Sequence, residues 1–132
     1  MTYHLQIVTP DGQYFDGQAE RLLVPTINGQ VGILARHINY VTALGMGPAK
    51  VVTEEGERHA ACIGGMLSVI NGEVRLIATT FEWAEDIDRE RAKSALARAE
   101  EKLADASLSK EEHRLAESAK RRAQVRLSIP QA

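Results

Sequence analysis

The chain has 132 residues and is poor in several residue types, each of which limits what the protein can be. It holds one cysteine, so an intrachain disulfide is excluded, and Cys62 has no partner for a metal site. Its place in the apolar run 60–63 predicts a buried strand residue rather than a nucleophile. No apolar run is long enough for a secretory leader or a membrane-spanning helix, so we expect a cytoplasmic protein without direct membrane insertion. Aromatic residues make up only 5% of the chain, so Val, Ile and Leu must fill the core.

An excess of positive charge is also missing. The net charge of −2 disfavours a general nucleic-acid binder, which would need a basic face. The last third nevertheless contains a basic stretch with no acid inside it, formed by Lys120, Arg121, Arg122 and Arg126. It has two readings that stay open here: a solvated helix end, where cations favour the macrodipole, or an anion site.

The sequence pattern changes near residue 84. Up to Thr80 apolar residues alternate with a period near two, and Gly-containing turns such as Asn28-Gly29 and Asn71-Gly72 separate the runs. We predict a β domain over residues 1–84, with extended segments at 3–8, 13–24, 30–34, 40–44, 50–53, 58–63, 66–70 and 73–78, and a bulge at Gly17. Such short, evenly spaced strands predict a sandwich or flattened barrel.

Residues 85–132 contain no glycine and predict a mobile helical hairpin. One apolar face consists of Ala92, Leu96, Ala99, Leu103 and Ala106, and a second consists of Ala116, Ala119, Ala123 and Leu127. Asp86 or Asp88 is the expected cap of the first helix, and residues 109–112 form a capping box for the second. Because each buried methyl group stabilises by only about 0.8 kcal/mol, helices joined by alanines should separate easily.

Charged residues of the two helices should meet at one end of this hairpin. Asp88 and Arg91 are three residues apart, which by itself favours a cap and a weak ion pair. Arg98 lies two turns beyond Arg91 on the same side of the first helix, and an antiparallel return brings the guanidinium groups of Arg122 and Arg126 toward them. Converging guanidinium groups suit a polyphosphate, and Asp88 or Glu82 can accept from an adenine amino group or a ribose hydroxyl.

Catalytic interpretations find little support. The chain has no GK[ST] phosphate loop, and Ser68, His59, His37 and Asp11 form no recognisable nucleophile motif. The four histidines show no metal spacing. We therefore predict no catalytic residue and no metal site.

Nearly the whole chain resembles the epsilon subunit of bacterial rotary ATP synthase. The resemblance rests on the segments Met1-Thr2-Tyr3-His4-Leu5, Gly32-Ile33-Leu34 with His37 and Val41-Thr42-Ala43-Leu44, Gly64-Gly65-Met66-Leu67-Ser68-Val69, Ile87-Asp88-x-x-Arg91-Ala92, and Arg122-Ala123-x-x-Arg126-Leu127. It implies a ten-stranded β-sandwich followed by an antiparallel two-helix hairpin. It also implies a non-catalytic subunit of the central stalk, on the cytoplasmic face of the cell membrane.

The resemblance implies partners and site residues as well. The partners are the gamma subunit, the membrane rotor ring of c subunits, and the catalytic alpha and beta subunits, whose ATP hydrolysis the extended helices inhibit. ATP, whose need for Mg²⁺ stays open, is a regulatory ligand of the folded hairpin at Glu82, Ile87, Asp88, Arg91, Ala92, Arg98, Arg122 and Arg126. The rotor-ring contact is implied at Gln30, Arg36 and His37.

Some positions depart from the family pattern. Ala35-Arg36 stands where relatives often carry Pro-Gly, and Gln30 stands where they often carry an acid, so the rotor contact is expected to differ. The rival hypothesis from another class is a free-standing nucleotide-binding module that signals energy status. Co-purification with a gamma subunit separates the two.

Overall fold

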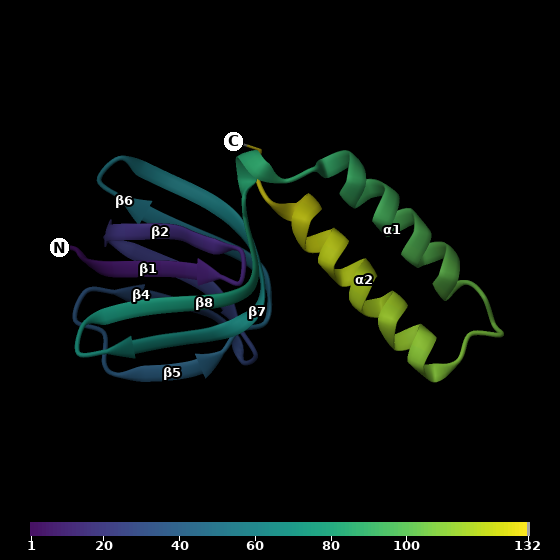
Figure 1. Ribbon diagram of the computed structural model, residues 1–132, viewed down its shortest axis with the longest axis horizontal. Coiled ribbons are helices and arrows are strands. Elements are labelled where there is room, and N and C mark those ends of the chain that lie inside the picture. Colours follow the sequence, from purple (N-terminus) through teal and green to yellow (C-terminus); the bar gives the residue numbers. More distant parts are fainter. Residues whose placement is uncertain (132) are drawn as a thin grey trace.

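The computed structural model describes residues 1–131, which form a β-sandwich followed by two helices (Figure 1). The strands are β1 (Tyr3–Thr9), β2 (Gly12–Ala19), β3 (Arg21–Thr26), β4 (Gly29–Leu34), β5 (Tyr40–Ala43), β6 (Met46–Thr53), β7 (Gly56–Ile70) and β8 (Glu73–Trp83). A short 3₁₀-helix, η1 (Ala84–Asp86), precedes α1 (Arg89–Leu103) and α2 (Lys110–Ser128). The predicted fold class is confirmed. Across residues 1–131 no helix is both long and apolar enough to cross a membrane.

The strands hydrogen-bond in the order β2-β1-β8-β7-β6-β3-β4, and β5 pairs with β7. Along β1, β6 and most of β8, alternate side chains point into one core, as the period of two predicts. Leu5 and Ile7 of β1, Leu22 of β3, Val51 of β6 and Leu76 of β8 are fully buried there. Aliphatic side chains therefore supply most of the core.

The structure has eight strands in residues 1–131 rather than the ten implied by the resemblance. The predicted strands 58–63 and 66–70 are parts of β7, because Gly64 and Gly65 bend this strand without ending it. Gly65 has a φ of 120°, and a Cβ there would lie 2.0 Å from the Ile77 carbonyl oxygen. Only glycine fits this bend, so one long strand pairs with β6 before the bend and with β5 after it.

Two further predictions about the strands are wrong. The predicted segment 13–24 is extended on both sides of Glu20, but it forms two strands rather than one, because β2 pairs with β1 whereas β3 pairs with β4 and β6. The predicted bulge at Gly17 is absent, since Gly17 pairs regularly with Leu5. The register shifts instead between Ile7 and Val8, opposite Tyr14. The extra residue is thus three positions from the glycine that suggested it.

The helix caps follow the sequence closely. The Asp88 side chain caps α1 by accepting the Arg91 backbone N–H at 3.0 Å, so Asp88 is the cap rather than Asp86. The Ser109 hydroxyl caps α2 by accepting the Glu112 backbone N–H at 3.1 Å. The seam between the helices consists of buried alanines, Ala92, Ala99, Ala116 and Ala123. Ala106 was predicted to join this seam but lies beyond the end of α1 and is exposed.

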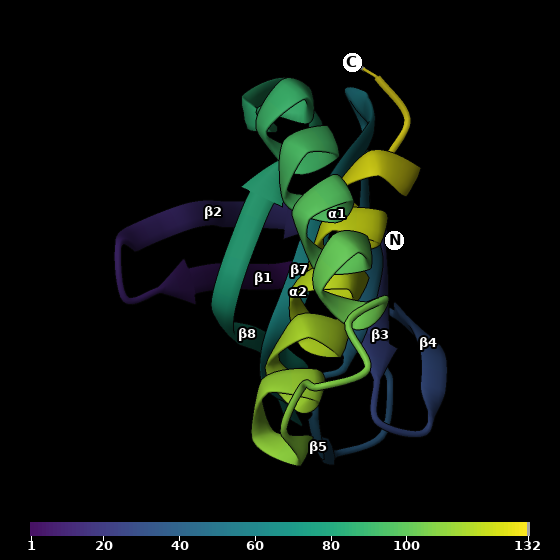
Figure 2. The same ribbon diagram turned by 90° about the vertical axis from the view of Figure 1, so that its right-hand side faces the viewer.

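The hairpin extends from one end of the sandwich, and α2 is the helix that contacts β6 and β7 (Figures 1 and 2). A small apolar cluster joins the two parts, formed by Ala61, Ala84, Ile87 and Ile129 with Val125 against it. Because three of these five side chains are isoleucine or valine and two are alanine, the apolar contact is limited. The hairpin is therefore attached to the sandwich by few large side chains.

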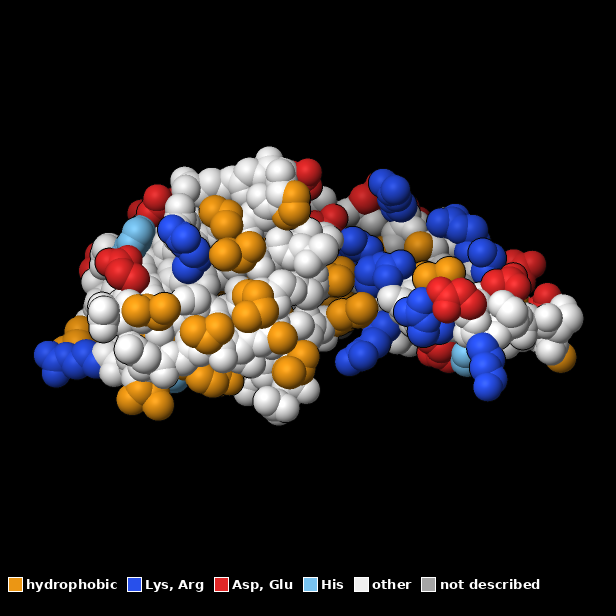
Figure 3. Space-filling view, turned by 60° about the horizontal axis from the view of Figure 1, so that its bottom comes forward, with side chains coloured by type: hydrophobic (Ala, Val, Ile, Leu, Met, Phe, Trp, Pro, Cys, Tyr) orange, Lys and Arg blue, Asp and Glu red, His pale blue; other side chains and the backbone are white. Residues whose placement is uncertain are grey.

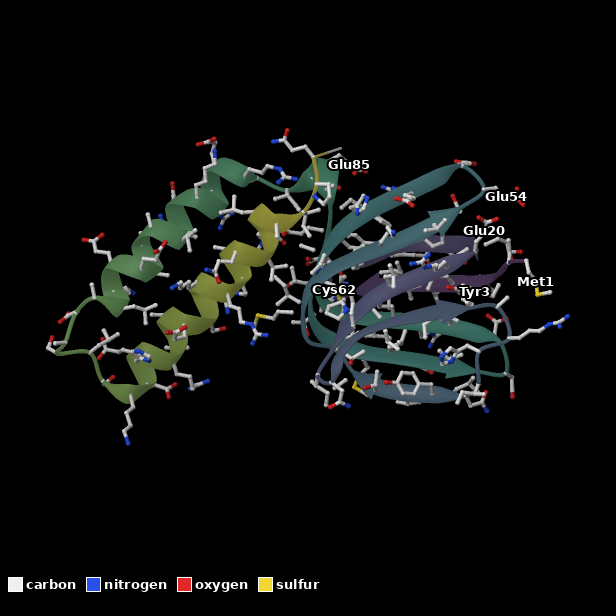
Figure 4. The ribbon with its side chains drawn as sticks, turned by 180° about the vertical axis from the view of Figure 1, so that it is seen from behind. Met1, Tyr3, Glu20, Glu54, Cys62 and Glu85 are labelled. Carbon is white, nitrogen blue, oxygen red and sulfur yellow. The ribbon has the colours of Figure 1, made fainter. Side chains whose placement is uncertain are left out.

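The segment that leads from the sandwich to the helices is held to the sandwich more firmly than the helices are. The Arg58 guanidinium lies 3.7 Å from the centre of the Trp83 ring and donates to the Glu85 carboxylate at 2.7 Å. A backbone hydrogen bond of Glu85, together with Arg58, lowers the pKa of this carboxyl group. Glu85 marks the place where the chain leaves the strands (Figure 4). The sandwich therefore includes the chain as far as η1.

Candidate functional site

A charged cavity lies where the hairpin meets the sandwich. It has a volume of about 440 Å³ and is lined from β8, η1, α1 and α2. Its lining residues are Glu82, Asp86, Asp88, Arg91, Ala92, Ala95, Arg98, Ala119, Arg122 and Arg126. Four guanidinium groups and three carboxyl groups thus surround a space that the small alanine side chains leave open.

An ion pair in this cavity joins the strands to the helices. Arg126 Nε of α2 donates to Glu82 Oε1 of β8 at 2.6 Å. The two side chains are 27% and 32% exposed, so solvent screens this ion pair only in part. Among residues 1–131 it is the one ion pair between a strand and either helix.

Within residues 1–131 the other three guanidinium groups of the cavity form no ion pair with a carboxylate. Arg122 donates to the Ser118 hydroxyl one turn earlier in α2 at 2.5 Å, which orients its side chain without neutralising it. Arg91 and Arg98 lie on α1, are exposed, and line the cavity from the opposite side. Lys and Arg side chains are also numerous over the helical part of the surface in Figure 3. The cavity therefore has the donors that an anionic ligand requires.

Most of the residues predicted to bind ATP line the cavity, but one of them is buried elsewhere. Seven of the eight line the cavity, whereas Ile87 is 9% exposed and packs against Ala61, Ala84 and Ile129. Three further residues line the cavity but were not predicted as site residues from the sequence: Asp86, Ala95 and Ala119. Helical spacing was a usable signal for the last two, because each lies three residues from an arginine of the cavity.

The residues predicted for the rotor contact do not lie together. Gln30 is beside the β3–β4 turn and donates to the Pro48 carbonyl at 3.3 Å. Arg36, with a φ of 66°, and His37 follow Leu34 at the other end of β4. Strand β4 has six residues, so its two ends lie roughly 16 Å apart. A partner that touches both ends must extend along the whole strand.

Two other predictions concern metal binding and the reactivity of the cysteine. Within residues 1–131, His, Cys, Asp and Glu side chains form no group of three or more that could hold a metal ion. Cys62 is buried in β7, and this burial raises the pKa of its thiol to about 12, so it is protonated at neutral pH. Figure 4 shows it at the end of the sandwich that faces the helices.

Comparison with known proteins assigns both parts of the chain. Residues 2–84 match the model of the ATP synthase delta/epsilon chain beta-sandwich domain. Residues 85–130 match the model of the delta/epsilon chain long alpha-helix domain. Together these matches cover nearly every residue.

Individual relatives agree. The chain is 42% identical to the ATP synthase epsilon chain of Exiguobacterium sp. over 129 residues, 97% of this chain and 95% of the relative. It is 38% identical to that of Caldanaerobacter subterraneus subsp. tengcongensis over 129 residues, 97% and 93% of the two chains.

Solved structures resemble it as well. The fold matches a chain of the Euglena gracilis mitochondrial ATP synthase OSCP/F1/c-ring structure with a TM-score of 0.79 and 25% identity, over 89% of this chain and 74% of that one. A chain of the Tetrahymena thermophila mitochondrial ATP synthase central stalk/c-ring matches in fold with a TM-score of 0.61 and 15% identity, over 94% and 92%. Because both the sandwich and the helices match its models, the chain belongs to the ATP synthase delta/epsilon chain family.

Proposed function

We propose that the chain is an epsilon-type subunit of the central stalk and that it senses ATP by binding it in the charged cavity. Epsilon chains of ATP synthase are non-catalytic, and the chain, as a member of their family, is a non-catalytic subunit of this complex. The observation that carries ATP binding is the convergence of Arg91, Arg98, Arg122 and Arg126 on one cavity of about 440 Å³.

The cavity offers the groups that a nucleoside triphosphate needs. Arginine side chains present forked donors that match phosphate oxygens, and they lie on both helices. Asp88 offers a carboxylate for an adenine amino group or a ribose hydroxyl. The side chains of Ala92, Ala95 and Ala119 leave room beside these charges.

ATP bound in the charged cavity would control whether α1 and α2 stay together. The ligand would touch α1 and α2 together, and a ligand that binds one arrangement shifts the population toward it. The seam that ATP would reinforce consists of alanines, which makes separation of the helices easy. Separated helices would carry Arg98, Arg122 and Arg126 to acidic surfaces of the catalytic alpha and beta subunits and inhibit ATP hydrolysis.

The sandwich offers the surface for the other partners. Val41 of β5, Met66 of β7 and Ile77 of β8 are 58%, 45% and 47% exposed on three adjacent strands. Exposed apolar side chains are also visible over the strands in Figure 3. We assign this apolar face to the gamma subunit, since contiguous exposed apolar residues mark protein interfaces. We assign a turn of the sandwich, at Gln30 or at Arg36 and His37, to the rotor ring on the cytoplasmic side of a proton-translocating enzyme.

Calorimetric titration of the isolated chain with ATP tests the sensing function. Arg91→Ala should weaken binding by about 1–3 kcal/mol, as expected for a lost charged hydrogen bond. Asp88→Asn is the cleaner change at the cap, because asparagine still caps the helix while the charge is removed. Arg114→Ala is the matched control, since Arg114 pairs with Glu111 near the start of α2, away from the cavity. Unchanged ATP affinity in the Arg91→Ala, Asp88→Asn double variant would remove the cavity from the function.

A further inference from the structure

We propose that a second cavity, between α2 and the end of the sandwich, binds a small amphiphilic anion, a free carboxylate with a linear acyl chain. This cavity has a volume of about 450 Å³ and shares no lining residue with the charged cavity, so the inference is independent of the proposed ATP site. Its lining residues are Thr26, Ile27, Leu44, Gly45, Met46, Ile63, Gly64, Thr79 and Arg121.

Apolar side chains from several parts of the sandwich form the walls of this second cavity. Ile27 lies in the turn after β3, where it is 67% exposed. Leu44 and Met46 lie between β5 and the start of β6, and Ile63 precedes the bend of β7. Apolar walls around a space of this size are typical of sites for small organic ligands, which occupy about 300–1,000 Å³. Burial of an apolar ligand body there would supply most of the affinity.

One charged group faces this apolar space. Within residues 1–131, Arg121 of α2 is the only ionisable residue that lines the second cavity, and it forms no ion pair with a carboxylate. Figure 3 shows apolar side chains and Lys or Arg side chains meeting at the notch between the sandwich and the helices. A single guanidinium, in contrast to the four of the charged cavity, suits one negative charge rather than a polyphosphate.

A glycine keeps a hydroxyl group of the second cavity accessible. A Cβ at Gly64 would lie 3.3 Å from the Thr79 hydroxyl oxygen, so a side chain there would crowd that hydroxyl. Thr79 is exposed on β8, and its hydroxyl is a donor for a carboxylate oxygen. The lining therefore combines one cation, one free-standing hydroxyl and apolar walls, which together match a carboxylate attached to an acyl chain.

Calorimetric titration of the full chain with free carboxylates tests this proposal. The probes are hexanoate, octanoate and decanoate, with decanol as the uncharged match, all below the concentrations at which they form micelles. Arg121→Gln removes the charge at an exposed position, and Thr79→Phe fills the cavity from an exposed position of β8. Arg114→Gln is the matched control, because Arg114 is an exposed arginine of the same helix that does not line the cavity.

We expect each added methylene to raise the affinity about fourfold, which corresponds to about 0.8 kcal/mol for a buried methylene. Arg121→Gln should lower the affinity for decanoate about tenfold and leave that for decanol unchanged, since only the carboxylate uses the charge. Thr79→Phe should remove most of the binding of both probes. Arg114→Gln should leave both affinities as they are in the parent chain.

Four results would overturn the proposal. Equal affinities for hexanoate and decanoate would show that the cavity buries no acyl chain. Decanoate binding that survives Thr79→Phe would place the ligand elsewhere on the chain. Decanol bound as tightly as decanoate would remove the role of Arg121. Co-sedimentation with phosphatidylglycerol vesicles, without binding of decanoate, would identify a membrane surface rather than a free ligand as the partner.

Discussion

The place where the helices can be removed follows from the packing of Trp83. In the sequence the alternating pattern ends at Thr80, so a fragment that ends at Phe81 keeps all of it. The structure extends the sandwich further. Trp83 is 5% exposed, lies 4.9 Å from the Phe81 ring centre, and donates its indole N–H to the Tyr14 carbonyl at 3.3 Å. Glu85 is held by Arg58. A fragment must therefore end at Asp86 to keep the sandwich whole.

These contacts set the expected difference in stability between fragments 1–81 and 1–86. Loss of a buried tryptophan typically destabilises a protein by about 3–5 kcal/mol. Domains of this size have a total free energy of unfolding of about 5–15 kcal/mol. Fragment 1–81 should therefore be marginally stable, whereas fragment 1–86 should retain most of its stability. At roughly 4–8 °C per kcal/mol, the melting temperatures should differ by more than about 12 °C.

Thermal and urea unfolding of both fragments, with Trp83→Ala in the 1–86 fragment as the matched variant, measures this difference. The Trp83→Ala fragment should melt close to fragment 1–81. Equal melting temperatures for fragments 1–81 and 1–86 would show that the end of β8 adds nothing to the core, and the reasoning would be wrong. In the reconstituted complex, fragment 1–86 should bind the gamma subunit and raise ATP hydrolysis. Unchanged hydrolysis at low and high ATP would show that the helices are not inhibitory.

Three further predictions concern the sandwich. The His4 ring hydrogen-bonds Asp16 at 2.5 Å and Glu73 at 2.6 Å, and these hydrogen bonds raise the pKa of His4 above 6.5. Protonated His4 therefore stabilises the folded state below about pH 6.5, and this stabilisation is lost as the pH rises through the raised pKa. Urea unfolding from pH 5 to 9 should show this loss in the parent chain and not in His4→Gln. Gly65→Ala should prevent folding or cost on the order of 3 kcal/mol or more, by circular dichroism and urea unfolding, because its Cβ would overlap the Ile77 carbonyl; a stability equal to the parent would contradict the bend. Cysteines at Gln30 and at His37 should not crosslink equally to the ring subunit, since they lie at opposite ends of β4; equal yields would require a partner extending along the strand.

The sequence by itself determined the features that depend on neighbours along the chain. Asp88 and Ser109 cap the helices because a cap is a hydrogen bond to a residue three positions away. The alanine seam follows from a spacing of three and four residues, and the inward strand residues follow from a spacing of two. The arginines of the cavity were found for the same reason, since two antiparallel helices return one end to the other.

Only the tertiary structure decided the features that join distant segments. Whether Gly64-Gly65 bends or ends a strand depends on β8 packing against it, so the sequence could not give the number of strands. The partner of Arg126 is 44 residues away on another element, and no local pattern selects Glu82 over the nearer carboxylates. Trp83 belongs to the sandwich rather than to the hairpin because Tyr14 and Phe81 surround it. Local hydrogen bonds and periodicity depend on residues that are close together in the sequence, whereas these contacts depend on how the whole core packs.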